Sequence, residues 1–452
     1  MNKVKRLKAF IKGRITTSIS VLLLLTAPCI QAQERSVQWD LTTCINYAME
    51  QNIQIRKSKI ALEESLIDTQ TAKAALFPNL SFSTSQNLVN KPLNNIAGVS
   101  KNSYSGNYGL NSSWTLYNGG KREKTIEQQK LQNRIQELSI NKSRNDIKIS
   151  ITECYLQILY AYESVKINKS TVEVSQAQRD RAEELLKAGS IAQSDYAQLE
   201  SQYSTDKYQL VTAEATLKDY KLQLKQLLEL DGADEMDLVL PELQDTTVLT
   251  PLPDKLDVYR EALTLMPEIQ SSKLAMDVSK INIAIAKAGY MPTLSASAGI
   301  GTSHSSGTDY TFNQQIKNGW SNSLGLTLSV PIFNNRETKS AVQKAKLASQ
   351  DSELDNLNEQ KTLFKTIENI YLDALSSQNR FVAATENLKS TQTSYDLIRE
   401  QFNLGMKNTV ELLTEKNNLL SAHQEVLQAK YMAILNSLLL NFYRGTEISL
   451  NN

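Results

Sequence analysis

Few residues of this chain have the types and spacing that enzyme or metal chemistry requires. There are two histidines, His304 and His423, and neither has a cysteine, an acidic cluster or the other histidine at a spacing that binds metal. Nucleotide-binding glycine loops and nucleophile motifs are also absent. We therefore expect a protein that is not an enzyme and has no cofactor or metal, and we interpret His304 as a solvated loop residue.

A polar pattern of another kind occurs twice. Gly189 is followed six residues later by Asp195, and Gly405 is followed six residues later by Glu411. Lys407 lies two residues after the second glycine. Opposite charges near a helix end can form ion pairs, which is reversible, non-covalent chemistry. What such pairs can do depends on the elements that carry them.

The two glycines belong to an internal duplication of the chain. An ordered repeat of this kind indicates one structure built from two similar halves. We assign repeat 1 to residues 33–230, a connector rich in Pro, Asp and Thr to 231–255, repeat 2 to 256–445 and a C-terminal tail to 446–452. Three segments recur in the same order: Ala75–Ser83 as Gly289–Ser297, Leu116–Gly119 as Ile332–Asn335, and Leu186–Gly189 as Asn403–Gly405.

Residues 1–32 are predicted to be a secretory signal peptide. Six basic residues precede an apolar stretch centred on Val21–Leu25, and Ile30–Ala32 offers a cleavage site. Cys29 raises lipidation as an alternative, which Pro28 before it disfavours. The whole chain has 49 Lys and Arg against 48 Asp and Glu, so loss of the six basic leader residues leaves a net charge near −5. This charge does not suit a nucleic-acid-binding protein, and no later segment is apolar enough for a transmembrane helix.

Two cysteines remain after the leader, Cys44 and Cys154. Helices that run antiparallel from the same strands would place both thiols at a similar depth, so a disulfide is one alternative in an oxidising compartment. Cys154 falls on an apolar helix stripe. We favour two small buried side chains that do not pair.

Four segments alternate polar and apolar residues with the period of a β-strand. They cover about 79–88, 107–117, 293–302 and 320–331. One face of each is apolar, the other holds Ser, Thr, Gly and Asn, and aromatic residues gather near the strand ends. Each segment has the length of a tilted strand that crosses a bilayer. The segments between paired strands, 90–103 and 302–315, are expected to be exposed loops.

Four strands are too few for a closed barrel, and an open sheet edge is not viable in lipid. Two chains would supply eight strands and three would supply twelve. The small polar residues of one face favour twelve strands around an open lumen. We therefore predict a homotrimer that completes a 12-stranded barrel and contacts outer-membrane lipid.

Long helices are predicted after the strands. Neither Pro nor Gly occurs from Lys121 to Lys187 or from Arg336 to Leu404, and each run corresponds to about 100 Å of helix. Return helices over 194–229 and 410–443 and short helices near 41–50 and 256–265 complete the two halves. A seven-residue apolar repeat predicts a left-handed coiled coil: Ile367, Ala374, Phe381, Leu388, Tyr395 and Phe402. The fold class is mainly α with a small β part, a long α-helical coiled-coil barrel joined to four transmembrane β-strands per protomer.

These features together resemble the TolC-like outer-membrane efflux protein family over essentially the whole mature chain. The resemblance is carried by Pro78 and Pro292 at the strand openings, by Tyr117–Gly120 and Val330–Asn334, and by the two helix-tip glycines. It implies an outer-membrane location with a large periplasmic part. It also implies a periplasmic adaptor and an inner-membrane pump as partners, with this chain as the passive exit duct of an efflux or secretion system.

The resemblance further implies a gate at the helix tips, with Lys407 paired to Asp195. Phe402 stands where the family has a tyrosine, so one hydroxyl link is expected to be missing. Thr414 stands where the family has a second acid, although Glu415 is adjacent. Mapped by distance from each glycine, the gate residues are Asp195, Phe402, Lys407, Glu411 and Thr414. The adaptor contacts are expected at the tips themselves, because a helix turn that ends in glycine exposes backbone: Ala188, Gly189, Ser190, Ile191, Leu404, Gly405 and Met406.

Two alternatives stay open at this point. A structural or adhesive coiled-coil envelope protein without channel activity would explain the helices, but not the paired two-faced strands of membrane-crossing length. Within the family, protein secretion and small-molecule efflux are not distinguished by the sequence, and neither is the transported substrate or the class of pump.

Overall fold

The computed structural model describes residues 38–93, 100–231, 236–241 and 243–450. The predicted signal peptide (1–32) with Cys29 lies outside the described residues, as do parts of the connector and the end of the tail. Residues Trp39–Asn452 form one compact unit.

Helices and strands follow each other in a similar order in the two halves of this unit. The long helices α3 and α8 have 67 residues each, and the return helices α4 and α9 have 35 each. The first half holds α1 (Leu41–Gln51), α2 (Ile53–Ala74), β1 (Asn79–Asn90), β2 (Asn102–Tyr117), α3 (Lys121–Lys187) and α4 (Gln193–Leu227). After η1 (Asp245–Thr247), the second half holds α5 (Lys255–Leu265), α6 (Pro267–Lys287), η2 (Ala288–Tyr290), β3 (Thr293–Ser305), α7 (Phe312–Asn318), β4 (Ser321–Ser329), α8 (Glu337–Asn403) and α9 (Thr409–Tyr443).

The four strands form one antiparallel sheet in the order β1-β2-β3-β4. The pairing of β2 with β3 joins the two halves of the chain. Residues opposite each other in an antiparallel pair lie on the same face of the sheet, so the register decides which side chains share a face. Phe82, Leu110 and Ile300 form one cross-strand row, whereas Asn111, Gly299 and Ser323 belong to a row on the other face. The predicted division into an apolar and a small polar face is confirmed.

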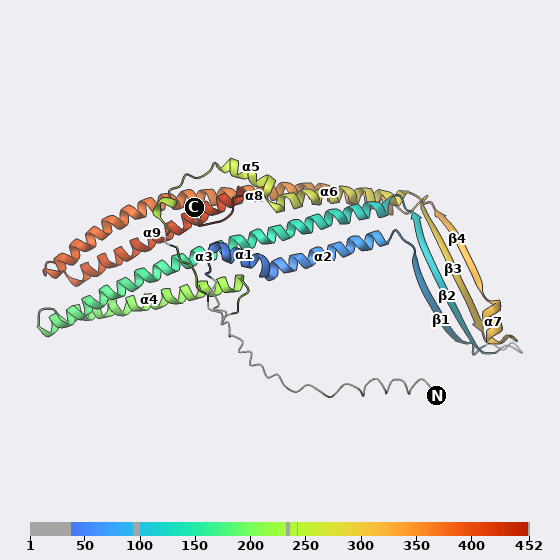
Figure 1. The fold of residues 1–452 in the computed structure, drawn as a ribbon, viewed down its shortest axis with the longest axis horizontal. Coiled ribbons are helices and arrows are strands. Elements are labelled where there is room, and N and C mark those ends of the chain that lie inside the picture. The colour runs from blue at the N-terminus through green and yellow to red at the C-terminus, as the bar shows by residue number, and fades with distance from the viewer. Residues whose placement is uncertain (1–37, 94–99, 232–235, 242, 451–452) are drawn as a thin grey trace, which may run out of the picture. The chain divides into compact units, whose positions relative to one another are not determined.

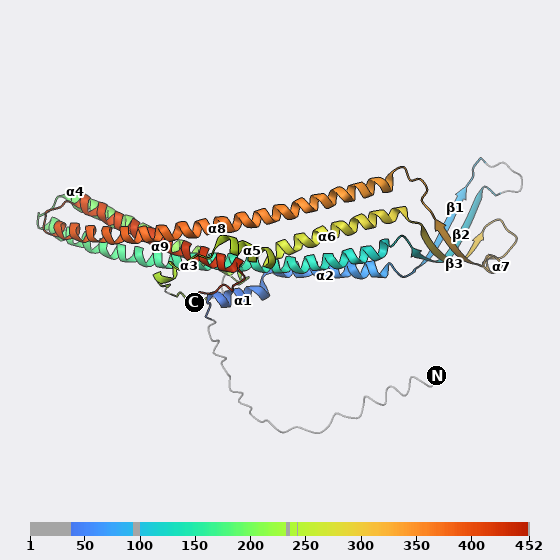
Figure 2. The ribbon, with the colours of Figure 1, turned by 90° about the horizontal axis from the view of Figure 1, so that it is seen from above.

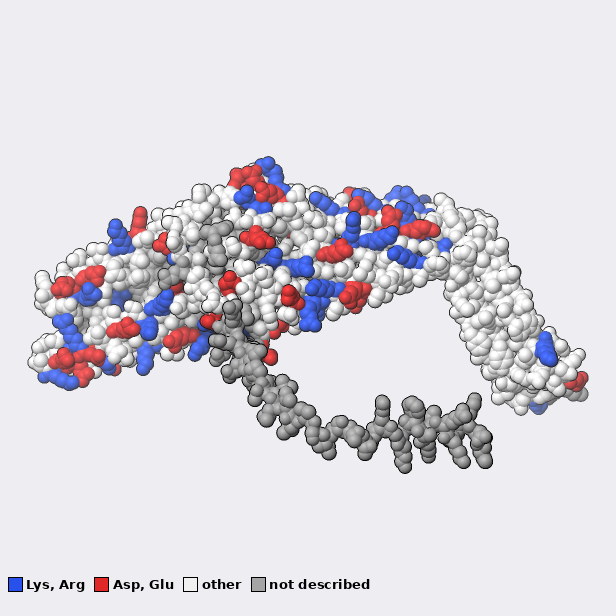
Figure 3. All heavy atoms as spheres, viewed as in Figure 1, with Lys and Arg blue, Asp and Glu red and all other residues white. Residues whose placement is uncertain are grey.

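The sheet has no core of its own on either face. Every residue of β1 and of β4 is exposed, and Leu324 is 90% exposed although it is fully apolar. None of the residues in the four strands is Asp, Glu, Lys or Arg. Figure 3 shows the same contrast, because charged side chains cover the helices and leave most of the strand surface without charge. A sheet of this composition needs an apolar medium against one face and water against the other.

The long helices continue from the strands and change partners along their length (Figures 1 and 2). Near the sheet, α3 packs against α2 and α6, and α8 packs against α6; farther away, α3 pairs with α4 and α8 pairs with α9. We refer to α3–α4 as the first hairpin and to α8–α9 as the second hairpin. No helix among the described residues is long and apolar enough to cross a membrane.

Two apolar cores lie where the short helices meet the hairpins. One joins α1 and the connector to the first hairpin and to parts of α8 and α9, and it includes Tyr155 and Tyr431. The other joins α5 and α6 to α8 and includes Ile269 and Ile367. The predicted seven-residue stripe of α8 supplies buried residues to these contacts, since Ile367, Ala374 and Phe381 are all less than 5% exposed.

Both cysteines are buried in the first core, where the structure has them as free thiols. Burial raises the pKa of Cys44 to about 12 and the pKa of Cys154 to about 11. The Cys154 thiol donates to the Tyr220 carbonyl oxygen at 3.4 Å. The favoured expectation of two buried, unpaired side chains therefore agrees with the structure, and the disulfide is not formed in it.

Two expectations about the segment between β3 and β4 are wrong. This segment is not a plain loop, because β3 runs to Ser305 and the helix α7 begins at Phe312, where Thr311 and Gln314 form a reciprocal capping box. His304 is not a solvated loop residue either. It lies within β3, half-buried, with its ring stacked on Tyr108 and edge-on to Phe312. The strand pairing also extends farther than predicted between β1 and β2, to Asn90 and Asn102.

Helices α2 and α6 were not predicted as separate elements. Many apolar residues of α2 face outward: Ile53, Ile60, Leu66 and Ile67 are more than 40% exposed. Besides Ile55, its buried residues are polar: Ser65 and Thr69 both hydrogen-bond to Asn133 of α3. A helix that buries serine and threonine shows no apolar stripe, so the periodicity that revealed α3 and α8 is missing here.

We predict that Gly106→Ala destabilises the sheet by about 1–3 kcal/mol through overpacking. A methyl group at Gly106 would collide with the His304 ring and with the Gln86 side chain. Thermal unfolding of the purified protein, followed by circular dichroism, measures the loss. The double variant Gly106→Ala/His304→Ala should recover part of it, and strictly additive effects of the two substitutions would contradict this account.

Candidate functional site

The two hairpins end in the same helix-terminating turn. Gly189 and Gly405 have φ of +70° and +73°, the left-handed region that favours glycine. Ser190 N donates to Leu185 O at 2.8 Å, and Met406 N donates to Gln401 O at 2.9 Å. A side chain at either glycine would meet no atom within 4 Å, so conformation and not crowding requires glycine here. Both turns therefore leave backbone groups uncovered by side chains at the predicted tips.

The start of α9 holds three of the polar residues at the second tip. Asn408 Oδ1 accepts from Glu411 N at 2.9 Å, and Glu411 Oε2 accepts from Asn408 N at 3.2 Å, which is a reciprocal capping box. The other carboxyl oxygen of Glu411 accepts a hydrogen bond from Lys407 Nζ. The bond from Lys407, followed by the bond from the Asn408 amide, lowers the pKa of Glu411. Glu411 is therefore ionised at neutral pH and fixed to its own turn.

In the single chain Lys407 pairs with Glu411, and its pairing with Asp195 stays a prediction for the assembled protein. Lys407 contacts Glu411, four residues later on the same hairpin, because the capping turn brings these two side chains together. Asp195 lies half-buried in the first turn of α4, where the positive end of the helix dipole favours an acid. The N-cap of α4 is Ala192, which offers no side-chain bond, so the two tips are capped differently.

The remaining predicted gate residues face different surroundings. Phe402 is half-buried and lines a cavity of about 260 Å³ between the two hairpins, together with Leu199 and Leu412. Thr414 is exposed, and its hydroxyl donates to Val410 O of its own helix at 2.8 Å. Phe402 thus contributes an apolar contact between the hairpins, and Thr414 contributes no charge.

The predicted adaptor contacts are mostly exposed. Leu404 and Met406 are 67% and 71% exposed, and the neighbouring Val410 is 57% exposed, so the second tip presents an apolar patch. At the first tip Ala188, Gly189 and Ser190 are exposed, whereas Ile191 is half-buried and lines the cavity with Phe402. The two tips therefore differ in apolar surface.

The hairpins are also joined by polar contacts between residues that were not predicted as part of the site. Arg181 Nη1 donates to Asn403 Oδ1 at 2.8 Å, and Gln178 Nε2 donates to the Tyr395 hydroxyl at 3.3 Å. Farther from the tips, a buried ion pair joins Asp206 of α4 to Lys416 of α9. A signal for this pair exists, because Asp206 lies seven residues after the buried Leu199 and Lys416 lies four after the buried Leu412. Each charged residue therefore occupies a position that its spacing from a buried leucine predicts to be buried.

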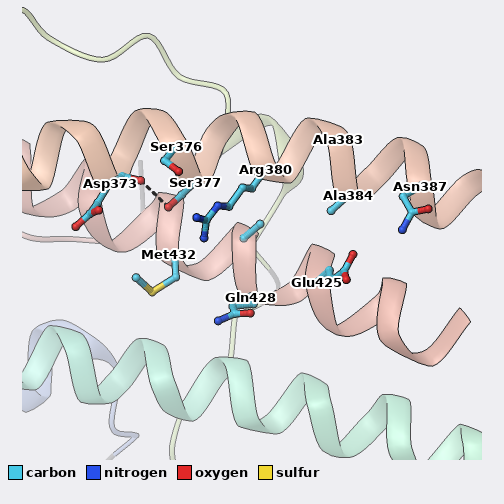
Figure 4. Close-up of a pocket in the computed structure, with 11 residues that line it drawn as sticks. Asp373, Ser376, Ser377, Arg380, Ala383, Ala384, Asn387, Glu425, Gln428 and Met432 are labelled. Carbon is cyan, nitrogen blue, oxygen red and sulfur yellow. Dashed lines mark hydrogen bonds between the residues drawn. The ribbon is translucent and has the colours of Figure 1, made fainter. Parts of the chain in front are cut away.

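A larger open cavity of about 570 Å³ lies between α8 and α9 (Figure 4). Small side chains leave this space, including Ser377, Ala384 and Ala429, and Arg380 points across it toward Met432 and Gln428. Its lining also includes Asp373 and Glu425. Over the whole described part of the chain, no three His, Cys, Asp or Glu side chains are placed to hold a metal ion.

Comparison with known proteins identifies the fold and the family. The sequence model of the family described as "Outer membrane efflux protein" matches residues 44–229 and 258–445, which is most of the chain. The chain belongs to this family. Members of the family are outer-membrane channels of efflux and secretion systems, and an outer-membrane location applies to this chain as well.

Curated relatives include proteins from several bacteria. The chain is 26% identical to the alkaline protease secretion protein AprF of Pseudomonas aeruginosa over 65% of its own length and 61% of AprF. It therefore spans less than two thirds of AprF. It is 24% identical to the outer membrane protein TolC of Escherichia coli over 87% of its own length and 80% of TolC.

Solved structures show the same fold at lower identity. A CusC structure superposes with a TM-score of 0.76 at 19% identity and covers 91% of this chain and 93% of its own. The outer-membrane channel OprN superposes with a TM-score of 0.73 at 18% identity and covers 97% and 98%. The mainly helical architecture with a small antiparallel sheet is thus confirmed as the fold of this family.

We predict that Asn408→Ala weakens the first turn of α9 by about 1 kcal/mol, the usual loss for an N-cap. Hydrogen–deuterium exchange should show faster exchange of the amides of residues 410–414, by about fivefold. Ser190→Ala at the other tip is the matched control, because the cap of α4 does not use a side chain. Equal exchange in the wild type and the Asn408 variant would show that the cap does not hold this tip.

Proposed function

We propose that this chain is the exit duct of a tripartite efflux or secretion system, a passive conduit with its gate at the periplasmic helix tips. The observation that carries this proposal is the sheet, whose strands hold no charged residue and have one apolar and one small polar face. Attached to it are helices of 67 residues, each about 100 Å long. A membrane-spanning wall with a long helical extension suits a duct that crosses from one membrane toward another.

Three copies of the chain would complete the wall. Strands β1 and β4 are the edges of the sheet, and their free backbone groups need partners in lipid. Pairing β4 of one copy with β1 of the next closes a barrel, and three copies give twelve strands. The face lined by Ser81, Asn111, Gly299 and Ser323 would then surround the lumen, and its small side chains leave the lumen open. The outer face would contact outer-membrane lipid.

The small polar side chains of the proposed lumen face give the duct itself little means to select its cargo. Its rows contain no charge, and Val89 at the far end of β1 is their one bulky apolar side chain among the described strand residues. Relatives are named for different cargo, since AprF is an alkaline protease secretion protein and CusC of Escherichia coli O157:H7 is a cation efflux system protein. We infer that an inner-membrane pump and a periplasmic adaptor choose the cargo and supply the energy.

The gate in this proposal is the ring of tips around the lumen. Lys407 and Glu411 hold the turn after Gly405, and Phe402 packs between the hairpins. Asp195 lies in the first turn of α4, and Thr414 lies in the second turn of α9. Contacts at half-exposed positions are weak and reversible, which suits a gate that a docking partner opens. The apolar patch of Leu404, Met406 and Val410 is the surface we assign to the adaptor, because a patch of this kind indicates a protein contact.

We predict that Leu324→Arg prevents stable insertion of the sheet, because a cation on the lipid face of a strand costs about 2–4 kcal/mol near the bilayer centre. Ser323→Arg is the matched control: it lies next to Leu324 but on the polar face of the same strand. The amount of oligomer extracted from the outer membrane measures insertion. Equal loss in both variants would contradict the assignment of the two faces.

We predict that Lys407→Ala raises the open probability of the channel several-fold, because the turn after Gly405 loses its ion pair. Single-channel recording of the purified protein in a planar bilayer measures this, and the wild type should give small, mostly closed currents. Lys187→Ala is the matched control, since Lys187 forms a comparable i, i+4 pair with Glu183 at 2.6 Å at the other tip. Unchanged gating in the Lys407 variant would place the lock elsewhere.

A correctly assembled oligomer that carries no current would overturn the conduit itself. That result would favour a structural or adhesive coiled-coil protein of the envelope instead.

A further inference from the structure

One ion pair of this chain is buried almost completely. Lys416 of α9 and Asp206 of α4 contact each other with 5% and 3% of their side chains exposed. Gln202 Nε2 donates to the other carboxyl oxygen of Asp206 at 2.7 Å and also reaches Asn417 Oδ1 at 3.4 Å. The pair thus joins the first hairpin to the second hairpin, and a second polar contact lies beside it.

Burying two charges is costly, so stability alone does not explain this pair. Well-packed apolar residues of similar volume commonly serve as well or better, whereas removing one partner leaves an uncompensated charge in a low dielectric. Burial lowers the pKa of Lys416, although the hydrogen bond and the charge of Asp206 oppose this effect. A pair of this kind does specify one position of α4 against α9, because a slip of either helix would leave both charges unpaired.

The pair lies between the contacts at the tips and the first apolar core. Toward the tips, the hairpins are joined by the exposed Arg181–Asn403 bond, by the Gln178–Tyr395 bond and around the 260 Å³ cavity. Away from the tips, a second cavity of about 300 Å³ comes first, and Tyr431 then donates to Glu163 at 2.7 Å within the first apolar core. Lys416 lies seven residues after the start of α9, which is about 10 Å along the helix. The pair is therefore a buried charged contact between the hairpins that separates the tips from the apolar core.

We propose that the Asp206–Lys416 pair is the clamp that keeps the hairpins together while their tips separate, so that it sets where the opening motion ends. This inference rests on the proposed function, because it assigns a position to the base of the proposed gate. Asp206, Lys416 and Gln202 are positioning residues here, since they act through the helices and contact no cargo. The tip contacts open on the far side of the clamp, and the apolar core on the near side stays closed.

Lys416→Met tests the clamp, because it leaves the buried Asp206 charge without its partner. Single-channel recording of the assembled protein should show open probability at least several-fold above wild type. The double variant Asp206→Leu/Lys416→Met replaces both charges by apolar side chains and should return gating close to wild type. Lys207→Met is the matched control, since Lys207 is an exposed lysine beside Asp206 on α4, and it should leave gating unchanged.

Hydrogen–deuterium exchange gives a second readout that does not depend on current. In the wild type, amides of residues 193–205 and 409–415 should exchange faster than those of the following turns. In Lys416→Met, fast exchange should spread into residues 417–424. In the double variant, the boundary between fast and slow exchange should lie where it lies in the wild type. An unchanged boundary in Lys416→Met, or wild-type gating in an assembled Lys416→Met, overturns the clamp.

The outcomes separate the clamp from the conduit. No current from assembled wild-type protein defeats the proposed conduit, whereas current that is the same in wild type and Lys416→Met defeats the clamp alone. If Lys416→Met does not assemble, the double variant decides: the clamp requires it to assemble with the wild-type exchange boundary. A double variant that fails to assemble, or whose boundary has moved, overturns the proposal.

Discussion

The sheet of this protein can neither pair the backbone groups at its edges nor cover its own apolar face, and this constraint governs the rest of the structure. Its two edge strands have unpaired backbone groups, and its apolar face has no core to cover it. Lipid can cover the apolar face but cannot bond to a peptide group. In the proposed function, these edges meet strands from other copies of the same chain. The helices inherit this arrangement, because each of α2, α3, α6 and α8 is joined directly or through a short turn to a strand.

The long helices are held together by different interactions from those of the sheet. Each long helix packs against few neighbouring helices in any part of its length, so a thick apolar core does not form along the whole helical part. The chain concentrates apolar packing in two cores near the short helices α1 and α5. Elsewhere it uses buried serine, threonine and asparagine, as in the contacts of Ser65 and Thr69 with Asn133. Polar contacts of this kind fix the position of one helix against another with little apolar area.

Much of the fold could be predicted because its signals are periodic. The two-residue alternation of Leu324 to Leu328 gave the strand faces, and the absence of Pro and Gly gave the bounds of α3 to the residue. Local chemistry was harder to read. The capping box of Thr311 and Gln314 lies in a segment rich in polar residues, which hid α7. His304 stood outside the expected strand, yet the pairing reaches it because Gly106 opposite leaves room for its ring.

The candidate site was predicted in position but not in detail. Glycine with an acid six residues later located both tips, because a left-handed turn requires glycine whatever surrounds it. The partner of Lys407 depended on the capping turn of Asn408 and Glu411, which distance from the glycine alone does not reveal. Asp206 and Lys416 were overlooked because each lies in a helix rich in polar residues. Only their spacing from Leu199 and Leu412 marks them as buried.

The pairing of Leu110 with Ile300 in the middle of the sheet has a consequence for the order in which the molecule is made. Each hairpin consists of two helices that are adjacent in sequence, so it can form as soon as its own segment has been synthesised. The sheet cannot, because β2 must wait for β3, which is synthesised only after the whole first half and the connector. Contacts between such distant segments form slowly. Until then the uncharged strands expose leucine and phenylalanine to water, so the newly exported chain needs protection from aggregation before it reaches lipid.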